Sequence, residues 1–314
     1  MSTHELPGGV AVRTFSPAPD GFDPLQATEK ELLAYGYPSR PQEPALLQRW
    51  ERVLGGSVQL IQPTFGRLPY ERQRRRRPWR GVDAGAVHGT EFTEIWSGAV
   101  VYAPEGDTCG WVEGEWTVPN AFPPKHAASG TWYSVSTWIG LDGIHGGDVL
   151  QAGCDSTAMT SAGKIHRQLN PWWEWYPADT VAITNLPVVP GDTLDCLICV
   201  DAGSATAASI FMLNVTSGVA ASFRATAPDG TALAGDCAEW VVERLKINSP
   251  TPQLARYGDV YFAAASAGTV AGAVVNAGAA NVITMTDTGD VTGHPLSTGL
   301  IETPTLVQVR YTGP

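Results

Sequence analysis

Basic residues are scarce in this chain of 314 residues, in which only 16% of the side chains are charged. Lys and Arg number 20 against 31 Asp and Glu, and the net charge is −11. The excess of acid lies after residue 90, because residues 1–90 have a net charge of +3 and residues 91–314 one of −14. An acidic surface repels the phosphates of nucleic acids and of anionic membranes. We therefore expect neither as a partner.

Long apolar runs are also missing, so no membrane span is predicted. The first residues, Met1–Gly8, lack the basic start and the apolar core of a secretory signal. Export after trimming of a signal, export by another route and retention in the cell all stay open.

Cysteine is present in an odd number, five, so the cysteines cannot all pair within the chain. Cys196 and Cys199 have the spacing of a metal-binding or redox pair, but they fall in a predicted strand, 193–200. Residues three apart on a strand face opposite sides. We expect these thiols to fill the core and not to hold a metal.

Helix signals are confined to the first 90 residues. Thr28 and Glu31 have the spacing of a capping box, and Gly36 follows as a stop. A second amphipathic helix ends before Gly55, and its apolar face is formed by Leu46, Leu47, Trp50, Val53 and Leu54. Short amphipathic helices of this kind need a surface to cover.

A dense basic run, Arg72–Arg80, follows these helices. Like charges at this density repel one another unless they stay solvated or meet acidic surface. We interpret the run as a linker; a disordered tail and a nucleic-acid patch are the alternatives.

The remaining chain, 91–314, is predicted to be an all-β domain, an antiparallel β-sandwich with a short helical N-terminal extension. The whole chain contains 34 Gly, 24 Pro and 11 Trp, typical of short strands joined by tight turns. The clearest predicted strands are 92–102, 111–118, 131–141, 165–176, 193–201, 209–215, 219–225, 238–244, 259–262 and 305–312. Regular spacing without helices between them favours sheets packed face to face.

Several hydrolase motifs are absent: His-Glu-x-x-His, Gly-x-Ser-x-Gly and the phosphate-binding glycine loop. The six histidines stand in loop-like, separate contexts. A hydrolase built from this sequence would depend on carboxylate and amide groups, as enzymes that work in acid do.

Five motifs carry a specific resemblance. They are Trp96-Ser-Gly-Ala-Val100, Trp138-Ile-Gly-Leu-Asp142-Gly, Val149-Leu-Gln151-Ala-Gly-Cys-Asp155, Trp172-Trp-Glu174-Trp-Tyr176-Pro and Cys237-Ala-Glu239-Trp-Val-Val-Glu243. In this order they resemble the glutamic peptidases, or eqolisins, over roughly residues 94–262.

The resemblance implies a fold of the concanavalin A-like lectin and glucanase shape, with a catalytic dyad formed by Gln151 and Glu239. In this role Glu239 is the general base and acid, and Gln151 stabilises the oxyanion. The resemblance also implies polypeptide substrates, no metal or cofactor, a secreted monomer and activity in acid. Substrate-binding positions carried over in the same way are Trp96, Trp138, Asp142, Asp155, Trp172, Glu174 and Tyr176.

Each of these positions has a plainer interpretation. Asp142 and Asp155 suit turns, and the aromatic residues suit the core. Glu239 suits a solvent-facing strand, and Gln151 suits a turn before Gly153. Alternation along 172–176 places Trp172, Glu174 and Tyr176 on one strand face, and the remaining Trp173 and Trp175 in the core. The family often has Asp shortly before this motif, where this chain has Asn170-Pro171.

Eqolisin precursors begin with a pro-segment, and residues 1–90 have the corresponding basic character. We hypothesise that Arg72–Arg80 docks on the acidic active site at neutral pH and is released in acid.

Two other classes of protein remain as alternatives. A lectin-like carbohydrate-binding module or a glycosidase would use the same fold, the latter with Glu174 and Glu239 as its carboxylates. An interaction domain without catalysis is the third possibility.

Overall fold

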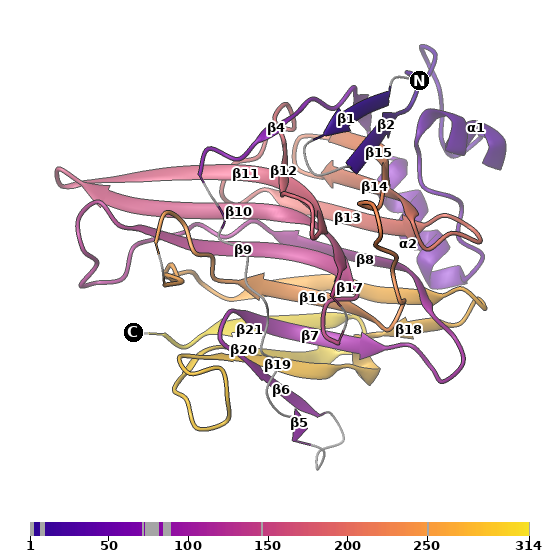
Figure 1. Ribbon diagram of the computed structural model, residues 1–314. Coiled ribbons are helices and arrows are strands. Elements are labelled where there is room, and N and C mark those ends of the chain that lie inside the picture. Colours follow the sequence, from indigo (N-terminus) through magenta and orange to yellow (C-terminus); the bar gives the residue numbers. More distant parts are fainter. Residues whose placement is uncertain are drawn as a thin grey trace.

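The computed structural model describes residues 3–6, 10–70, 72, 82–83, 89–145, 147–249 and 251–313, and shows an all-β sandwich (Figure 1). One sheet carries the candidate site and is called the site sheet. Its strands, in spatial order, are β4 (Phe65–Arg67), β12 (Val181–Ile183), β11 (Lys164–Tyr176), β10 (Val149–Ser161), β9 (Trp132–Leu141), β16 (Cys237–Glu243), β7 (Trp96–Tyr102) and β19 (Asn281–Thr286).

The second sheet packs behind the first. Its order is β21 (Leu306–Tyr311), β17 (Val260–Thr269), β8 (Cys109–Thr117), β13 (Thr193–Val200), β14 (Ala207–Asn214) and β15 (Val219–Thr226). Strand β20 (Pro295–Thr303) pairs with both β19 and β21 and so joins the two sheets. The pairings among these strands are antiparallel, which confirms the predicted fold class.

The remaining elements are shorter. They are β1 (Thr3–Leu6), β2 (Val10–Thr14), β3 (Gln59–Ile61), β5 (Val82–Asp83), β6 (Thr90–Thr93), β18 (Val274–Asn276) and the 3₁₀ helix η1 (Ala277–Ala279). Strands β2 and β3 extend the edge at β15, and β4 extends the edge at β12. The N-terminal segment therefore adds strands to both sheets.

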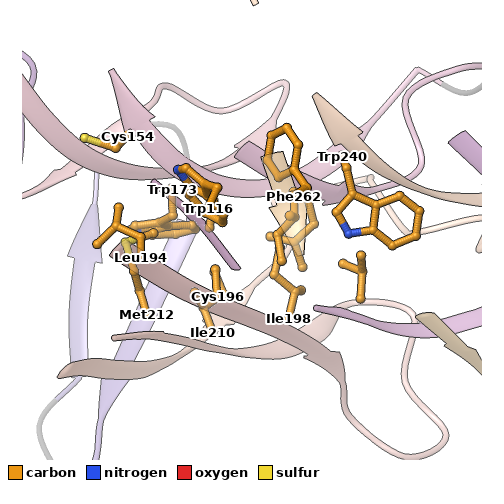
Figure 2. Packing of buried hydrophobic residues seen from close by; sticks show 14 of the residues in the cluster. Trp116, Cys154, Trp173, Leu194, Cys196, Ile198, Ile210, Met212, Trp240 and Phe262 are labelled. Carbon is orange, nitrogen blue, oxygen red and sulfur yellow. The ribbon is translucent and has the colours of Figure 1, made fainter. Parts of the chain in front are cut away.

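The core lies between the sheets and is rich in aromatic side chains (Figure 2). Trp173 and Trp175 are buried in it, as their alternation along β11 predicts. Gly114 of β8 lies against the rings of the opposite sheet: a Cβ there would come within 2.9 Å of Trp240. The close approach of the sheets thus depends on a residue without a side chain.

The two helices form where their capping signals predict them. Helix α1 (Glu29–Tyr35) has a capping box between Thr28 and Glu31 and ends at Gly36, whose φ of 83° suits glycine. Helix α2 (Pro44–Leu54) buries Trp50 and Leu54 and ends at Gly55. It packs on the outer face of β13 and β14, the surface that an amphipathic helix requires.

Helix α2 also brings one cation, Arg49, against three carboxylates of the second sheet. Its guanidinium forms ion pairs with Glu113 at 3.3 Å, with Glu115 at 3.8 Å and, at the shortest distance of the three, with Asp195. Burial raises the pKa of Glu113 to about 7, although Arg49 opposes this shift. Arg49 therefore offsets the negative charge of three carboxylates that lie close together under α2.

We predict that Arg49→Met lowers the free energy of unfolding by about 3–5 kcal/mol near pH 8, because it leaves buried carboxylates without a counter-charge. The loss shrinks toward pH 5, because burial raises the pKa of Glu113 to about 7 and also raises that of Asp195. Glu113 makes the stability of the wild-type chain depend on pH in the same direction. Its folded pKa exceeds its ordinary value, so its contribution to the free energy of unfolding is complete in acid and is lost as the pH rises through about 7.

Urea unfolding at pH 8 and at pH 5 measures this effect. The matched control is Arg52→Met, which removes an exposed cation from the same helix. Equal losses for the two Arg variants, or a loss for Arg49→Met that does not change with pH, would contradict the account.

Several strands were not predicted, β10, β19 and β20 among them. Strand β10 is buried on both faces along Val149–Ala158, so its sequence shows no alternation.

The predicted strand 92–102 is two strands, because the Thr93 hydroxyl accepts hydrogen bonds from the Ile95 and Trp96 amides and turns the chain. The predicted strand 259–262 is longer than expected: β17 continues through an Ala/Gly-rich stretch (263–280) as far as Thr269, and Gly268 leaves room for the Trp111 indole.

The five cysteines, all within the described ranges, are free thiols; Cys196 is buried in the core and Cys199 is partly exposed. No helix in the described part of the chain is long and apolar enough to cross a membrane.

Candidate active site

The strand register brings Gln151 and Glu239 to one face of the site sheet. Strand β9 lies between β10 and β16, and its Gly140 is the register partner of both residues. Two strand spacings, about 10 Å in all, separate the two backbones. Gly140 has no side chain, so the amide and the carboxyl lie on one face on either side of it. The edge of the Trp138 ring packs over this glycine, 3.0 Å from where a Cβ would stand.

Glu174 orients the Gln151 amide. It is the register partner of Gln151 on β11, and its Oε2 accepts a hydrogen bond of 3.0 Å from Gln151 Nε2. The Thr180 hydroxyl donates to the same oxygen at 3.1 Å. Gln151 Oε1 is buried and has no hydrogen-bond partner among the described residues. The orientation of the Gln151 amide is therefore fixed by the hydrogen bond from one of its N–H groups to Glu174. Its oxygen remains able to accept a hydrogen bond.

Three indole rings line the same face beside the dyad. Trp96 and Trp138 meet edge to face, with their ring centroids 4.8 Å apart, and Trp172 belongs to the same buried cluster. Gly153, which is the register partner of Trp138, allows this packing, since a Cβ on it would lie 2.4 Å from the Trp138 Cβ. Gly153 is thus a strand position, not the end of a turn.

Asp155 lies on β10 on the same face, four residues from Gln151. Its carboxylate accepts hydrogen bonds from Ser136 at 2.5 Å and from Tyr70 at 2.6 Å. Asn170, its register partner, donates to the Tyr70 oxygen at 3.4 Å. Burial, followed by the charge of Asp155, raises the pKa of Tyr70 well above its ordinary value. The turn interpretation of Asp155 is therefore wrong.

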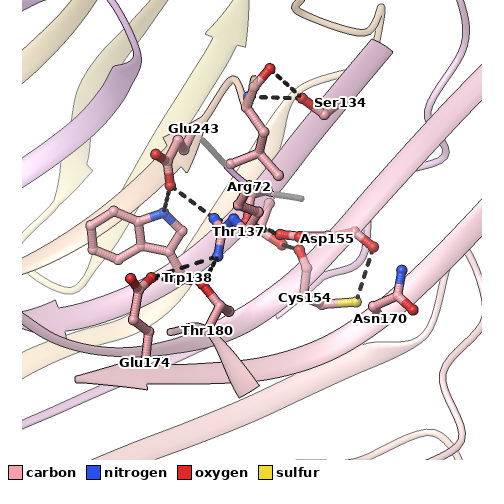
Figure 3. Close-up of polar contacts among 12 residues, drawn as sticks. Arg72, Ser134, Thr137, Trp138, Cys154, Asp155, Asn170, Glu174, Thr180 and Glu243 are labelled. Atoms are coloured by element: carbon pink, nitrogen blue, oxygen red, sulfur yellow. Dashed lines mark hydrogen bonds and ion pairs between the residues drawn. The ribbon is translucent and has the colours of Figure 1, made fainter. Parts of the chain in front are cut away.

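Arg72 of the N-terminal segment crosses this face (Figure 3). Its guanidinium lies 3.2 Å from Glu243, 3.8 Å from Asp155 and 3.9 Å from Glu174, and its Cζ is 4.2 Å from the centroid of the Trp172 ring. Burial alone would lower the pKa of Arg72, but these carboxylates outweigh it and raise the pKa. We call the four surrounding side chains, Asp155, Trp172, Glu174 and Glu243, the guanidinium site.

Asp142 and Tyr176 lie at one end of the same face. Asp142 follows β9 with a φ of 66°, and its carboxylate accepts hydrogen bonds from the backbone amides of Gly235 and Asp236. This is the turn geometry expected of an Asp, and it anchors the loop that enters β16. Tyr176 ends β11, two residues after Glu174.

Four further residues complete the site and were not predicted as site residues. Glu243 lies four residues after Glu239 on β16, so period-2 alternation could have placed it on this face. Trp138 Nε1 donates to it at 3.1 Å. The contacts of Ser136, Tyr70 and Thr180 depend on strand pairing and chain path and leave no sequence signal. The remainder of the basic run, residues 73–80, lies outside the described residues.

Both residues of the candidate pair are buried: Gln151 is 4% exposed and Glu239 is 0% exposed. The solvent-facing interpretation of Glu239 is therefore wrong. Leu68 packs on the indole cluster, and Tyr70 and Arg72 bind to the carboxylates beside it. Within the described residues, no group of three or more His, Cys, Asp or Glu is arranged to hold a metal ion.

Comparisons with known proteins identify the fold and the family. Solved structures that share the fold include scytalido-glutamic peptidase bound to a transition-state analogue, at 20% identity, a TM-score of 0.56 and coverage of 74% of this chain and 100% of that chain. SCP-B, a member of the eqolisin family in complex with the tripeptide Ala-Ile-His, matches at 19% identity, a TM-score of 0.53 and the same coverage. No match is found among curated protein sequences.

The sequence profile of the Peptidase A4 family matches residues 94–311, which span the five motifs and every predicted site residue. This match covers well over half of the chain. The chain therefore belongs to the Peptidase A4 family, the eqolisins, and is a glutamic-type endopeptidase.

Proposed function

We propose that this endopeptidase hydrolyses peptide bonds in acid with Gln151 and Glu239 as its catalytic pair. The observation that carries the proposal is the shared register partner, Gly140, which puts the two side chains on one face, on either side of a residue that has no side chain. We expect the attacking water and the peptide carbonyl to bind between this amide and this carboxylate once the N-terminal segment leaves the face.

The chemistry follows from the two groups. Ionised Glu239 takes a proton from the water as its oxygen attacks the carbonyl carbon. Gln151 Nε2 has a second N–H besides the one engaged by Glu174, and this N–H stabilises the developing oxyanion, while Oε1 orients the water. Glu239 then returns the proton to the amide nitrogen as the C–N bond breaks, which leaves a carboxylic acid and an amine.

The glycosidase alternative is disfavoured by the family match, since the Peptidase A4 profile covers residues 94–311. A glycosidase would also need Glu174 as one of its two carboxyl groups. In this structure Glu174 Oε2 instead accepts hydrogen bonds from Gln151 and Thr180.

Digestion of a denatured protein at about pH 3–4, with a metal chelator and inhibitors of serine and aspartic peptidases present, tests the proposal. We expect cleavage to continue under these conditions. A chain that cleaves a polysaccharide but no protein, or that cleaves neither, would overturn it.

We further propose that residues 1–90 act as a pro-segment and that the enzyme is made as a zymogen. A peptide cannot reach the buried dyad in this arrangement, and Leu68, Tyr70 and Arg72 lie on the same face. Strands β4 and β6 pair at opposite edges of the site sheet, β4 with β12 and β6 with β19, and the described residues that follow β4 contact the face between these edges. In acid, protonation of the carboxylates around Arg72 removes the attraction that holds it.

We predict that Arg72→Ala raises the initial rate of the full-length chain, on transfer from neutral to acid buffer, by about tenfold. It removes charge-assisted contacts that are each expected to contribute roughly 1.5–3 kcal/mol. Continuous fluorescence of a quenched peptide measures the rate and any lag. Mass spectrometry of the acid-incubated chain locates the cut.

Arg67→Ala is the matched control, because it removes an exposed cation five residues earlier on the same segment. It should leave the initial rate unchanged. If the full-length chain and a chain starting near residue 90 have equal specific activity at neutral and acid pH, the segment does not inhibit.

A further inference from the structure

The guanidinium site is made by the peptidase domain and not by the segment that occupies it. Its members come from three strands: Asp155 from β10, Trp172 and Glu174 from β11, and Glu243 from β16. All lie within the family match at residues 94–311, whereas Arg72 lies outside it. The four residues of the site therefore belong to the part of the chain that matches the family, and the residue they surround does not.

The contacts match the shape and charge of a guanidinium. Nη2 of Arg72 faces the carboxylates of Glu243 and Asp155, Nη1 faces Glu174, and the Trp172 ring lies 4.2 Å from Cζ. Arg keeps its charge in acid, offers several donors in one plane and stacks on aromatic faces. An ammonium group would satisfy fewer of these partners at once.

The same site directly adjoins the proposed catalytic amide. Glu174 Oε2 lies 3.0 Å from Gln151 Nε2 and 3.9 Å from Arg72 Nη1. A substrate side chain bound in the place of the Arg72 guanidinium would therefore belong to a residue next to the scissile bond. When the segment is absent, Arg72 no longer offsets the charges of the three carboxylates, and a cationic substrate side chain would take over that role.

We propose that the guanidinium site is a specificity subsite for a basic substrate side chain, arginine foremost, and that Arg72 occupies it as a substrate residue would. The inference rests on the proposed function and adds to it a substrate class: polypeptides with arginine beside the cleaved bond.

Two synthetic peptides that differ in one residue test this proposal. One contains a single arginine, and the other has citrulline in its place, which keeps the planar shape and removes the charge. Both are given at about pH 4 to the full-length chain carrying Arg72→Ala, which vacates the site. We expect cleavage beside the arginine, with kcat/KM about tenfold or more above that for the citrulline peptide, as expected for hydrogen bonds to charged groups.

The variant Glu243→Gln should bring the ratio of the two rates close to one. Glu105→Gln, which removes an exposed carboxylate from a turn between β7 and β8, should leave the ratio unchanged. If the Arg72→Ala chain with Glu243 intact cleaved the two peptides at equal rates, the inference would be overturned and the proposed function would remain intact.

If neither peptide is cleaved, binding to the chain carrying both Arg72→Ala and Glu239→Gln decides the matter. Roughly tenfold tighter binding of the arginine peptide would support the subsite even though the proposed proteolysis had failed. Equal binding would overturn both.

Discussion

Glu239→Gln is expected to lower kcat/KM for peptide cleavage in acid by about 1,000- to 10,000-fold. The substitution keeps the size of the side chain and removes the group that takes a proton from water and returns it to the leaving amine; general acid–base catalysis contributes up to roughly this factor. Initial rates on a quenched peptide, with product identity confirmed by mass spectrometry, measure the loss.

The matched control for this variant is Glu105→Gln, an equal change of charge at an exposed turn. It should retain the wild-type rate. A Glu239→Gln chain that is folded and retains more than about a tenth of the wild-type rate would show that another group activates the water.

Gln151→Ala is expected to lower kcat by about 100-fold or more and to change KM little. The amide N–H binds an oxyanion that exists only near the transition state, and one such donor commonly contributes about 3 kcal/mol. Steady-state kinetics at a fixed acid pH separate the two parameters.

An exposed glutamine on β11 provides the control: Gln168→Ala should have wild-type kinetics. If Gln151→Ala raised KM alone and left kcat unchanged, the amide would bind substrate uniformly and would have no role in stabilising the oxyanion.

The sequence predicts those parts of the fold in which local pattern and environment agree. Along β11, Trp173 and Trp175 alternate with Trp172 and Glu174, and the structure buries the first pair between the sheets. Helix α1 likewise starts and stops where its capping box and Gly36 place it. In both cases the residues that decide the outcome are near neighbours in sequence.

Strand β10 shows where this approach fails. Gln151 and Asp155 suit a turn because Gly153 stands between them, yet Gly153 is required by the Trp138 side chain on the next strand. That requirement exists only after β9 and β10 have paired. The placement of Gln151 opposite Gly140 depends on the same register, which no single segment encodes.

The contacts over the site depend on the path of the chain. A basic segment ahead of an acidic body predicts attraction between them, but it does not select Arg72 as the residue that lies on Trp172. Neither does it indicate that Tyr70 bonds to Asp155. Both contacts follow from the pairing of β4 with the edge strand β12, which sets where the segment enters the site face.

The measurement that tests the central claim most directly is a double-mutant cycle on Gln151 and Glu239, with kcat/KM determined for the wild-type chain, Gln151→Ala, Glu239→Gln and the double variant at one acid pH. Two groups that act on the same water and carbonyl lose their effect together, so we expect the double variant to be at most about tenfold slower than Glu239→Gln alone. A double variant slowed by the full product of the two single losses would mean that the groups act independently and would contradict the account.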